Sequence, residues 1–103
     1  MIRTAVTVVA AAALGLALAA PAQAAGDVAA GKAKAGSCAM CHGPAGQGTQ
    51  MGPKLTGLDP AKFTQQMNDY KAGKGNNAMM KSAAASLSAD DIANLAAYYA
   101  SLK

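Results

Sequence analysis

The feature that most constrains this chain is the segment CAMCH, residues 38–42, which holds both of its cysteines and its only histidine. The two thiols lie three positions apart, about one helical turn, and the histidine follows the second thiol directly. A disulfide across so short a loop would stabilise a fold very little, because the effect grows with the length of the closed loop. The interior of the molecule must therefore be stabilised by something else.

The first 24 residues have the layout of a secretory signal peptide. Arg3 precedes an Ala/Leu/Val stretch over 5–20, and Ala22-Gln23-Ala24 forms a small-x-small cleavage site. The apolar stretch is shorter than the ~20 residues that a membrane-spanning helix needs. We therefore expect cleavage after Ala24, export to the periplasm and no stable membrane insertion, with an uncleaved membrane anchor as the alternative. Residues 25–103 then form a single domain.

This domain has few large apolar side chains, and alanine supplies most of its hydrophobic residues. Chains of this length are rarely stable on a hydrophobic core alone and usually recruit a disulfide, a metal or another cross-link. The whole sequence has a formal net charge of +4, with lysines scattered instead of clustered. Nucleic-acid binding normally needs clustered basic residues with stacking groups, so we do not expect it here.

Helical patterns cover most of the domain, and no segment has the alternating pattern of a strand. We predict an all-α fold with about four short helices. Their segments are 27–38, 58–73, 74–86 and 87–103, and the Gly/Pro-rich segment 43–60 is predicted to be a long loop.

Helix-start signals support these assignments. Asp27 and Asp59 are predicted N-caps, and Pro60 suits the first helical position. Ser88 with Asp91 three residues later resembles a capping box.

The CAMCH segment is the attachment pattern of a c-type haem. Cys38 and Cys41, one turn apart, can add to the two vinyl groups of a porphyrin, and His42 is then held over the ring face, within reach of the iron. One covalently attached haem c would also fill the interior. A thioredoxin-like pair expects a βαβ setting, a structural zinc site needs about four ligands, and a plain disulfide would leave the histidine without a role.

The second axial ligand of such an iron must be something other than histidine, and methionine is the usual choice in electron-carrying cytochromes c. Met40 lies inside the attachment segment, and Met51 lies too close to it along the chain to cross to the opposite face. Met67 shares a helical stripe with Phe63 and Tyr70 and is expected to pack in the core.

Met79 and Met80 remain, and adjacent residues of one helix cannot both point inward. The positions three, four and seven residues after Met80 are Ala83, Ala84 and Leu87, an apolar stripe, whereas Met79 is followed by Ser82, Ala83 and Ser86. We predict Met80 as the ligand, with Met79 as the alternative. A further alternative is that both only pack.

Three segments, GKAKAGSCAMCHG, MGPKLTGL and NAMMKSAAASLSADDIANLAAYY, resemble a class I cytochrome c over essentially all of 26–103. The similarity is to the short single-haem bacterial type, cytochrome c-553, and to single domains of cytochrome c4. It implies about four helices wrapped around one haem, with Met80 as axial ligand and the Pro53 carbonyl bonded to His42. It also implies close crossing of the first and last helices at Gly31 and Tyr98.

One departure is Ala35, where family members often carry an aromatic residue three positions before the first cysteine. Looser packing between helices, or compensation by Tyr98 and Tyr99, is expected there.

Ligation by His42 and Met80 would fill both axial positions, so we expect an electron carrier with no substrate chemistry of its own. The alternatives are a dedicated haem subunit of a larger oxidoreductase and a ligand-binding haem protein. We expect a monomer whose redox partners have an acidic docking surface. The lysines expected to orient such partners lie in segments that surround the haem in this family; they are Lys54, Lys71, Lys74 and Lys81.

Overall fold

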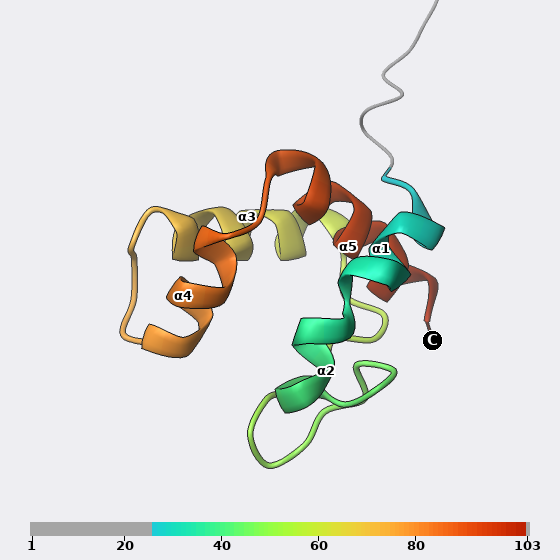
Figure 1. Cartoon of the computed structure of the whole chain (residues 1–103), viewed down its shortest axis with the longest axis horizontal. Helices are drawn as coiled ribbons and strands as arrows, with labels where there is room; N and C mark the ends of the chain where they lie inside the picture. The colour runs from blue at the N-terminus through green and yellow to red at the C-terminus, as the bar shows by residue number, and fades with distance from the viewer. Residues whose placement is uncertain (1–25, 103) are drawn as a thin grey trace, which may run out of the picture.

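The computed structural model describes residues 26–102, and this part of the chain is entirely helical, with no strand (Figure 1). Five helices follow one another as α1 (Val28–Lys34), α2 (Gly36–His42), α3 (Pro60–Lys71), α4 (Ala78–Ala85) and α5 (Ala89–Ser101). None of these helices is long and apolar enough to cross a membrane. The predicted signal peptide, residues 1–24, lies outside the described residues.

The all-α prediction is confirmed, but the first predicted helix, 27–38, is in fact two. The chain turns at Ala35, whose N–H bonds to the carbonyls of both Gly31 and Lys32 and so tightens the end of α1. Gly36, expected to loosen the end of a single helix, instead begins α2. This second helix continues through the cysteine segment to His42, four residues beyond the predicted end.

The predicted helix starts are confirmed. Asp27 accepts a hydrogen bond from the N–H of Ala29, and Asp59 accepts one from the N–H of Ala61, in each case two residues later. Pro60 lies in the first turn of α3. An unpredicted cap begins α4, where the Asn77 side chain accepts a bond from the N–H of Met80 at 3.0 Å.

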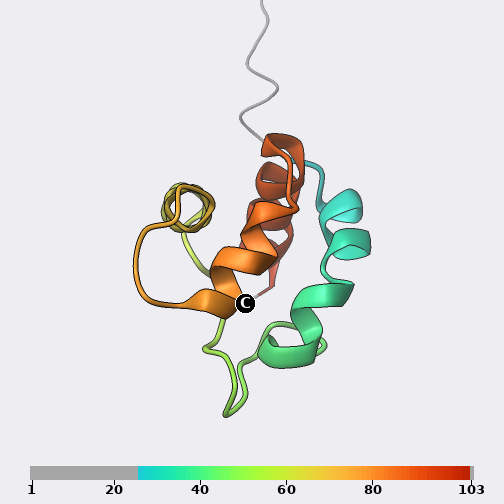
Figure 2. The ribbon, with the colours of Figure 1, turned by 60° about the vertical axis from the view of Figure 1, so that its left-hand side comes forward.

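The first and last helices cross closely, side by side in both ribbon views (Figures 1 and 2). Gly31 makes this possible, because a Cβ at that position would lie 2.0 Å from the carbonyl oxygen of Asn94 and 2.8 Å from Cβ of Tyr98. The crossing at Gly31 and Tyr98 that the family resemblance implied is therefore present.

The core forms where α3 contacts both α4 and α5, together with the turn at Ala35. The most deeply buried large side chains, Ile92, Leu95 and Tyr99, all come from α5. Ala35, the position where the family resemblance implied an aromatic residue, is itself buried in the same cluster as Tyr98 and Tyr99. The other buried members come from α3, α4, the turn that follows α4, and α5; they are Phe63, Met67, Ala84, Leu87, Ala96 and Tyr98.

A capping box fixes the start of α5. The Ser88 hydroxyl accepts from the Asp91 N–H, and the Asp91 carboxylate accepts from the Ser88 N–H, both at 3.0 Å. Lys34 of α1 places its Nζ 3.5 Å from the same carboxylate. The hydrogen bond from the Ser88 backbone N–H lowers the pKa of Asp91. Burial acts in the opposite direction, and the positive charge of Lys34 lowers the pKa further.

We expect Gly31→Ala to destabilise the haem-loaded protein by about 1–3 kcal/mol, because the added methyl group must push α1 away from α5. Gly36→Ala is the matched control, since a Cβ there meets nothing within 4 Å. It should leave stability unchanged or raise it by up to ~1 kcal/mol through higher helix propensity. Denaturant unfolding of both variants checks this, and equal effects would contradict the close crossing.

We expect Asp91→Ala to destabilise the protein at neutral pH and to matter much less in acid. A carboxyl group with a lowered folded-state pKa contributes stability above its ordinary pKa, and this is lost as pH falls through the folded-state value. The difference from wild type should therefore shrink as pH falls below the ordinary value of 3.8. Asp90→Ala, in the same first turn but outside the capping box, is the control. A stability difference between Asp91→Ala and wild type that does not change with pH would argue against the lowered pKa of Asp91.

Candidate functional site

Helix α2 carries the two cysteines and ends at the histidine. Cys38 and Cys41 are both half-buried free thiols one turn apart on this helix, and His42 is its last residue. Because side chains three apart on a helix lie on the same side, the two sulfur atoms project from one side of α2. Such a pair suits attachment to two points of one rigid planar group.

His42 is held in a fixed orientation. Its side chain is buried, and its Nδ1 lies 2.7 Å from the carbonyl oxygen of Pro53. A carbonyl can only accept, so Nδ1 carries the proton and Nε2 keeps its lone pair. This is the contact that the family resemblance implied for Pro53, and it leaves one imidazole nitrogen free to bind a metal ion.

The loop after α2 closes tightly around this histidine. A Cβ at Gly52 would lie 2.8 Å from both Cε1 and Nδ1 of the ring, so only a glycine lets the backbone approach so closely. The Gly48 N–H donates to the His42 carbonyl at 2.7 Å, and the Thr49 hydroxyl donates to the Cys41 carbonyl. These bonds satisfy carbonyl groups that the end of α2 leaves free.

Gly52 and Thr49 were not among the residues singled out from sequence. The signals in the sequence were the density of glycines in the loop and, for Gly52, its place in the segment MGPKLTGL. Neither showed which position meets the ring.

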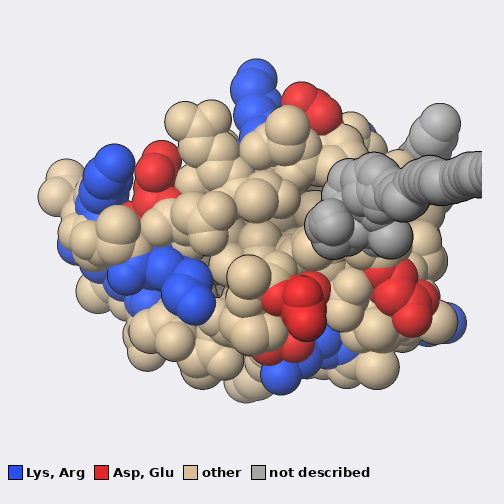
Figure 3. Space-filling model, turned by 90° about the horizontal axis from the view of Figure 1, so that it is seen from above, with Lys and Arg blue, Asp and Glu red and all other residues tan. Residues whose placement is uncertain are grey.

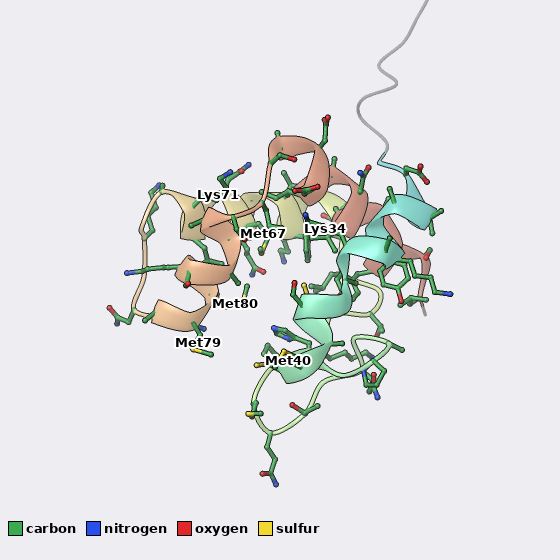
Figure 4. The ribbon with its side chains drawn as sticks, viewed as in Figure 1. Lys34, Met40, Met67, Lys71, Met79 and Met80 are labelled. Carbon is green, nitrogen blue, oxygen red and sulfur yellow. The ribbon has the colours of Figure 1, made fainter. Side chains whose placement is uncertain are left out.

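The methionines separate clearly by exposure. The exposed fractions of Met40, Met51 and Met79 are 79%, 73% and 72%, whereas Met67 is buried in the core as expected. Met80 is half-buried and packs against the core cluster. Figure 4 shows Met80 on the side of α4 that faces α2, with Met79 directed away from it. Of these two adjacent methionines, Met80 is therefore the one that faces α2, the helix that ends at His42.

The residues present fit a covalently bound haem. The donor set combines two free thiols, an imidazole with an available Nε2 and a thioether across the intervening space. Within residues 26–102, no group of three or more His, Cys, Asp or Glu side chains is placed to hold a metal ion by itself. A hollow of about 900 Å³ between α3 and α5 is lined by none of the site residues.

Comparisons with known proteins point the same way. The family described as cytochrome C oxidase, cbb3-type, subunit III, matches residues 23–98. Cytochrome c-554(548) of Halomonas halodenitrificans is 44% identical over 81 residues, which cover 75% of this chain and 98% of that protein. Cytochrome c4 of Pseudomonas aeruginosa is 45% identical over 83 residues, covering 80% of this chain and 41% of that protein.

A solved structure shares the fold. Cytochrome c4 of Acidithiobacillus ferrooxidans superposes with a TM-score of 0.72 at 28% identity, covering 76% of this chain and 51% of that one. The chain thus spans about half of the cytochrome c4 proteins that it matches, and nearly all of the shorter relative. Sequence and fold together show that the chain belongs to the class I cytochrome c family and carries one covalently bound haem c.

Proposed function

We propose that this protein is a periplasmic one-electron carrier whose haem is attached through Cys38 and Cys41 and ligated by His42 and Met80. The observation that carries the proposal is the bond between His42 Nδ1 and the Pro53 carbonyl, which directs the free Nε2 away from the loop. The half-buried Met80 on the facing side of α4 supplies the second ligand.

When bound, a haem c supplies reversible one-electron chemistry at its iron. The protein's own part begins with Pro53. Its carbonyl fixes the tautomer and the orientation of the imidazole and makes Nε2 a stronger donor, as partners of metal-bound histidines generally do. Gly52 holds this part of the loop against the ring, so the imidazole cannot rotate when the oxidation state changes.

The choice of Met80 over Met79 rests on helix geometry. Adjacent residues of an α-helix point about 100° apart, and the core contact made by Met80 fixes which of the two faces inward. The Asn77 cap holds the N–H of Met80 at the start of α4 and so sets the rotation of this helix. Met79 is left facing solvent.

A haem iron held by both His42 and Met80 would have no position left for a substrate, which favours electron transfer over catalysis. Thioether ligation also raises the reduction potential. Both ligands come from segments fixed by hydrogen bonds or core packing, so little movement has to accompany each electron.

A second candidate is a dedicated haem subunit within a larger oxidoreductase. The description of the matched family, an oxidase subunit, favours it. Co-purification of the native protein with a catalytic subunit would support this role, whereas isolation as a free small protein would support the mobile carrier.

We also propose that lysines orient an acidic partner. Figure 3 shows basic side chains gathered at the end of the molecule formed by α4 and the turn before it. Lys71, Lys74 and Lys81 belong to this region, while Lys54 lies in the loop next to Pro53. Lys71 also bonds to the Leu87 carbonyl, and Lys74 lies 3.7 Å from Asp69. Lys54 and Lys81 are therefore the better probes of docking.

We expect Met80→Ala to abolish the weak red absorption band that methionine-to-iron ligation gives the ferric protein, and to lower the reduction potential substantially. Met79→Ala, a neighbour of the same type and size, should leave both unchanged because its side chain faces solvent. Optical spectra and redox titration of both haem-loaded variants decide this. Equal losses in the two variants, or loss in Met79→Ala alone, would overturn the ligand assignment.

We expect oxidation of the ferrous protein by the anion hexacyanoferrate(III) to slow as salt is raised. Oxidation by the cation tris(phenanthroline)cobalt(III) should speed up, because salt screens the lysine charges within ~10 Å at 0.1 M. The double variant Lys54→Gln/Lys81→Gln should weaken both trends, and Lys32→Gln on α1 is the control. Stopped-flow rates that are insensitive to salt would contradict electrostatic steering.

A further inference from the structure

Helix α4, which carries Met80, is attached to the rest of the fold mainly through its last turn. The helix that it packs against is α3. Its buried residue, Ala84, lies in that last turn, and Leu87, just after the helix, is also buried. Before the helix the chain passes through Gly73 and Gly75, both with positive φ, where an added Cβ would meet nothing within 4 Å. The end of α4 is therefore the better supported of its two ends.

The turn after α4 contains a carbonyl group that needs a partner. Leu87 is only 7% exposed, and buried backbone carbonyls almost always accept a hydrogen bond. This carbonyl lies between two helices, because α4 ends at Ala85 and the first carbonyl used by α5 is that of Ser88, which accepts from the Ile92 N–H at 3.0 Å. Helix α4 also has no basic residue in its own last turn, although a positive charge stabilises that end of a helix.

Lys71, the last residue of α3, supplies both the donor and the charge. Its ammonium group donates a hydrogen bond to the Leu87 carbonyl, 16 residues further along the chain, and this bond is partly buried. Figure 4 shows Lys71 near the end of α4 that lies away from Met79. Hydrogen bonds from a charged donor are stronger than those between neutral groups. The bond therefore ties the end of α3 to the turn after α4.

We propose that Lys71 is a positioning residue for the axial ligand, because its bond to the Leu87 carbonyl holds α4 against α3 and so keeps Met80 in place. This inference rests on the proposed function, in which Met80 binds the iron. Helix α4 has only eight residues, so a movement of its last turn is passed on to Met80 near its start. At Gly73 and Gly75 no neighbouring atoms lie close enough to resist such a movement.

An external ligand that competes with Met80 for the iron measures how firmly α4 is held. Imidazole is suitable above its pKa, in its uncharged form, because the loss of a lysine charge then does not itself change its affinity. Imidazole binds only when Met80 has left the iron, so its affinity for the ferric protein rises when α4 moves away more easily. The loss of the methionine absorption band follows the binding.

The test compares Lys71→Met with Lys62→Met in the haem-loaded ferric protein. Both changes replace a lysine of α3 by an unbranched apolar side chain, but only the first removes the donor to Leu87; Lys62 is exposed. Imidazole should bind about two- to tenfold more tightly to Lys71→Met, the size of one hydrogen bond. Lys62→Met should have the wild-type affinity, and Lys71→Arg, which keeps a charged donor, should restore most of it.

Three outcomes would overturn the inference. They are an unchanged imidazole affinity in Lys71→Met, equal changes in Lys71→Met and Lys62→Met, and a Lys71→Arg variant that behaves like Lys71→Met. Imidazole binding reports on the folded protein, so a role of Lys71 in overall stability alone would lower the midpoint of denaturant unfolding and leave the affinity unchanged.

A measurement on the wild type keeps the inference testable if Lys71→Met fails to fold. Nitrogen-15 NMR of the lysine side chains should show a slowly exchanging ammonium group of Lys71, with scalar coupling across the hydrogen bond to the carbonyl carbon of Leu87. Absence of this coupling would refute the bond. Failure of the proposed function has a different signature, because the wild-type protein would then be colourless or would lack the methionine absorption band before any imidazole is added.

Discussion

The hydrogen bond between His42 Nδ1 and the Pro53 carbonyl is the interaction on which the rest of the site depends. It joins the end of α2 to the far side of the loop and at the same time selects the nitrogen that stays free. The backbone contacts around it, from Gly48 and Gly52, keep the loop close to the ring. Without the bond, the imidazole could rotate, and the loop would remain attached to α2 only through the bonds of Gly48 and Thr49 to its last carbonyl groups.

The second requirement is a support that does not move, and α5 provides it. Its buried face contacts α3, while α1 lies across its middle with no side chain at Gly31 to keep the two backbones apart. The chain has few large apolar residues, and it concentrates three of the most deeply buried ones, Ile92, Leu95 and Tyr99, in this single helix. A covalently bound haem then completes an interior that the side chains alone would leave too small.

Features set by short-range interactions could be predicted from the sequence. The caps at Asp27, Asp59 and Ser88 depend on contacts two or three residues away, and the spacing of Cys38, Cys41 and His42 is itself local.

Features that depend on distant parts of the chain could not be predicted in the same way. The turn at Ala35 arises because α1 must lie against α5 while α2 follows the loop, and the contact between Gly52 and the imidazole involves backbone that no side-chain pattern reveals. The exposure of Met79 and the partial burial of Met80 could be predicted only in part. The apolar stripe on the helix indicated that Met80 faces inward, and the packing of α4 against the core determines that it does.

The turn at Ala35 also separates two tasks along the chain. Helix α1, before the turn, is anchored to α5 through the crossing at Gly31 and the ion pair between Lys34 and Asp91. Everything after it, α2, carries the thiols and the imidazole. Because the two helices have independent axes, a substitution that shifts α1 by a fraction of an ångström is absorbed at the turn and need not tilt α2. The contact between α1 and α5 can therefore adjust while the sulfur atoms and the histidine of α2 keep their mutual geometry.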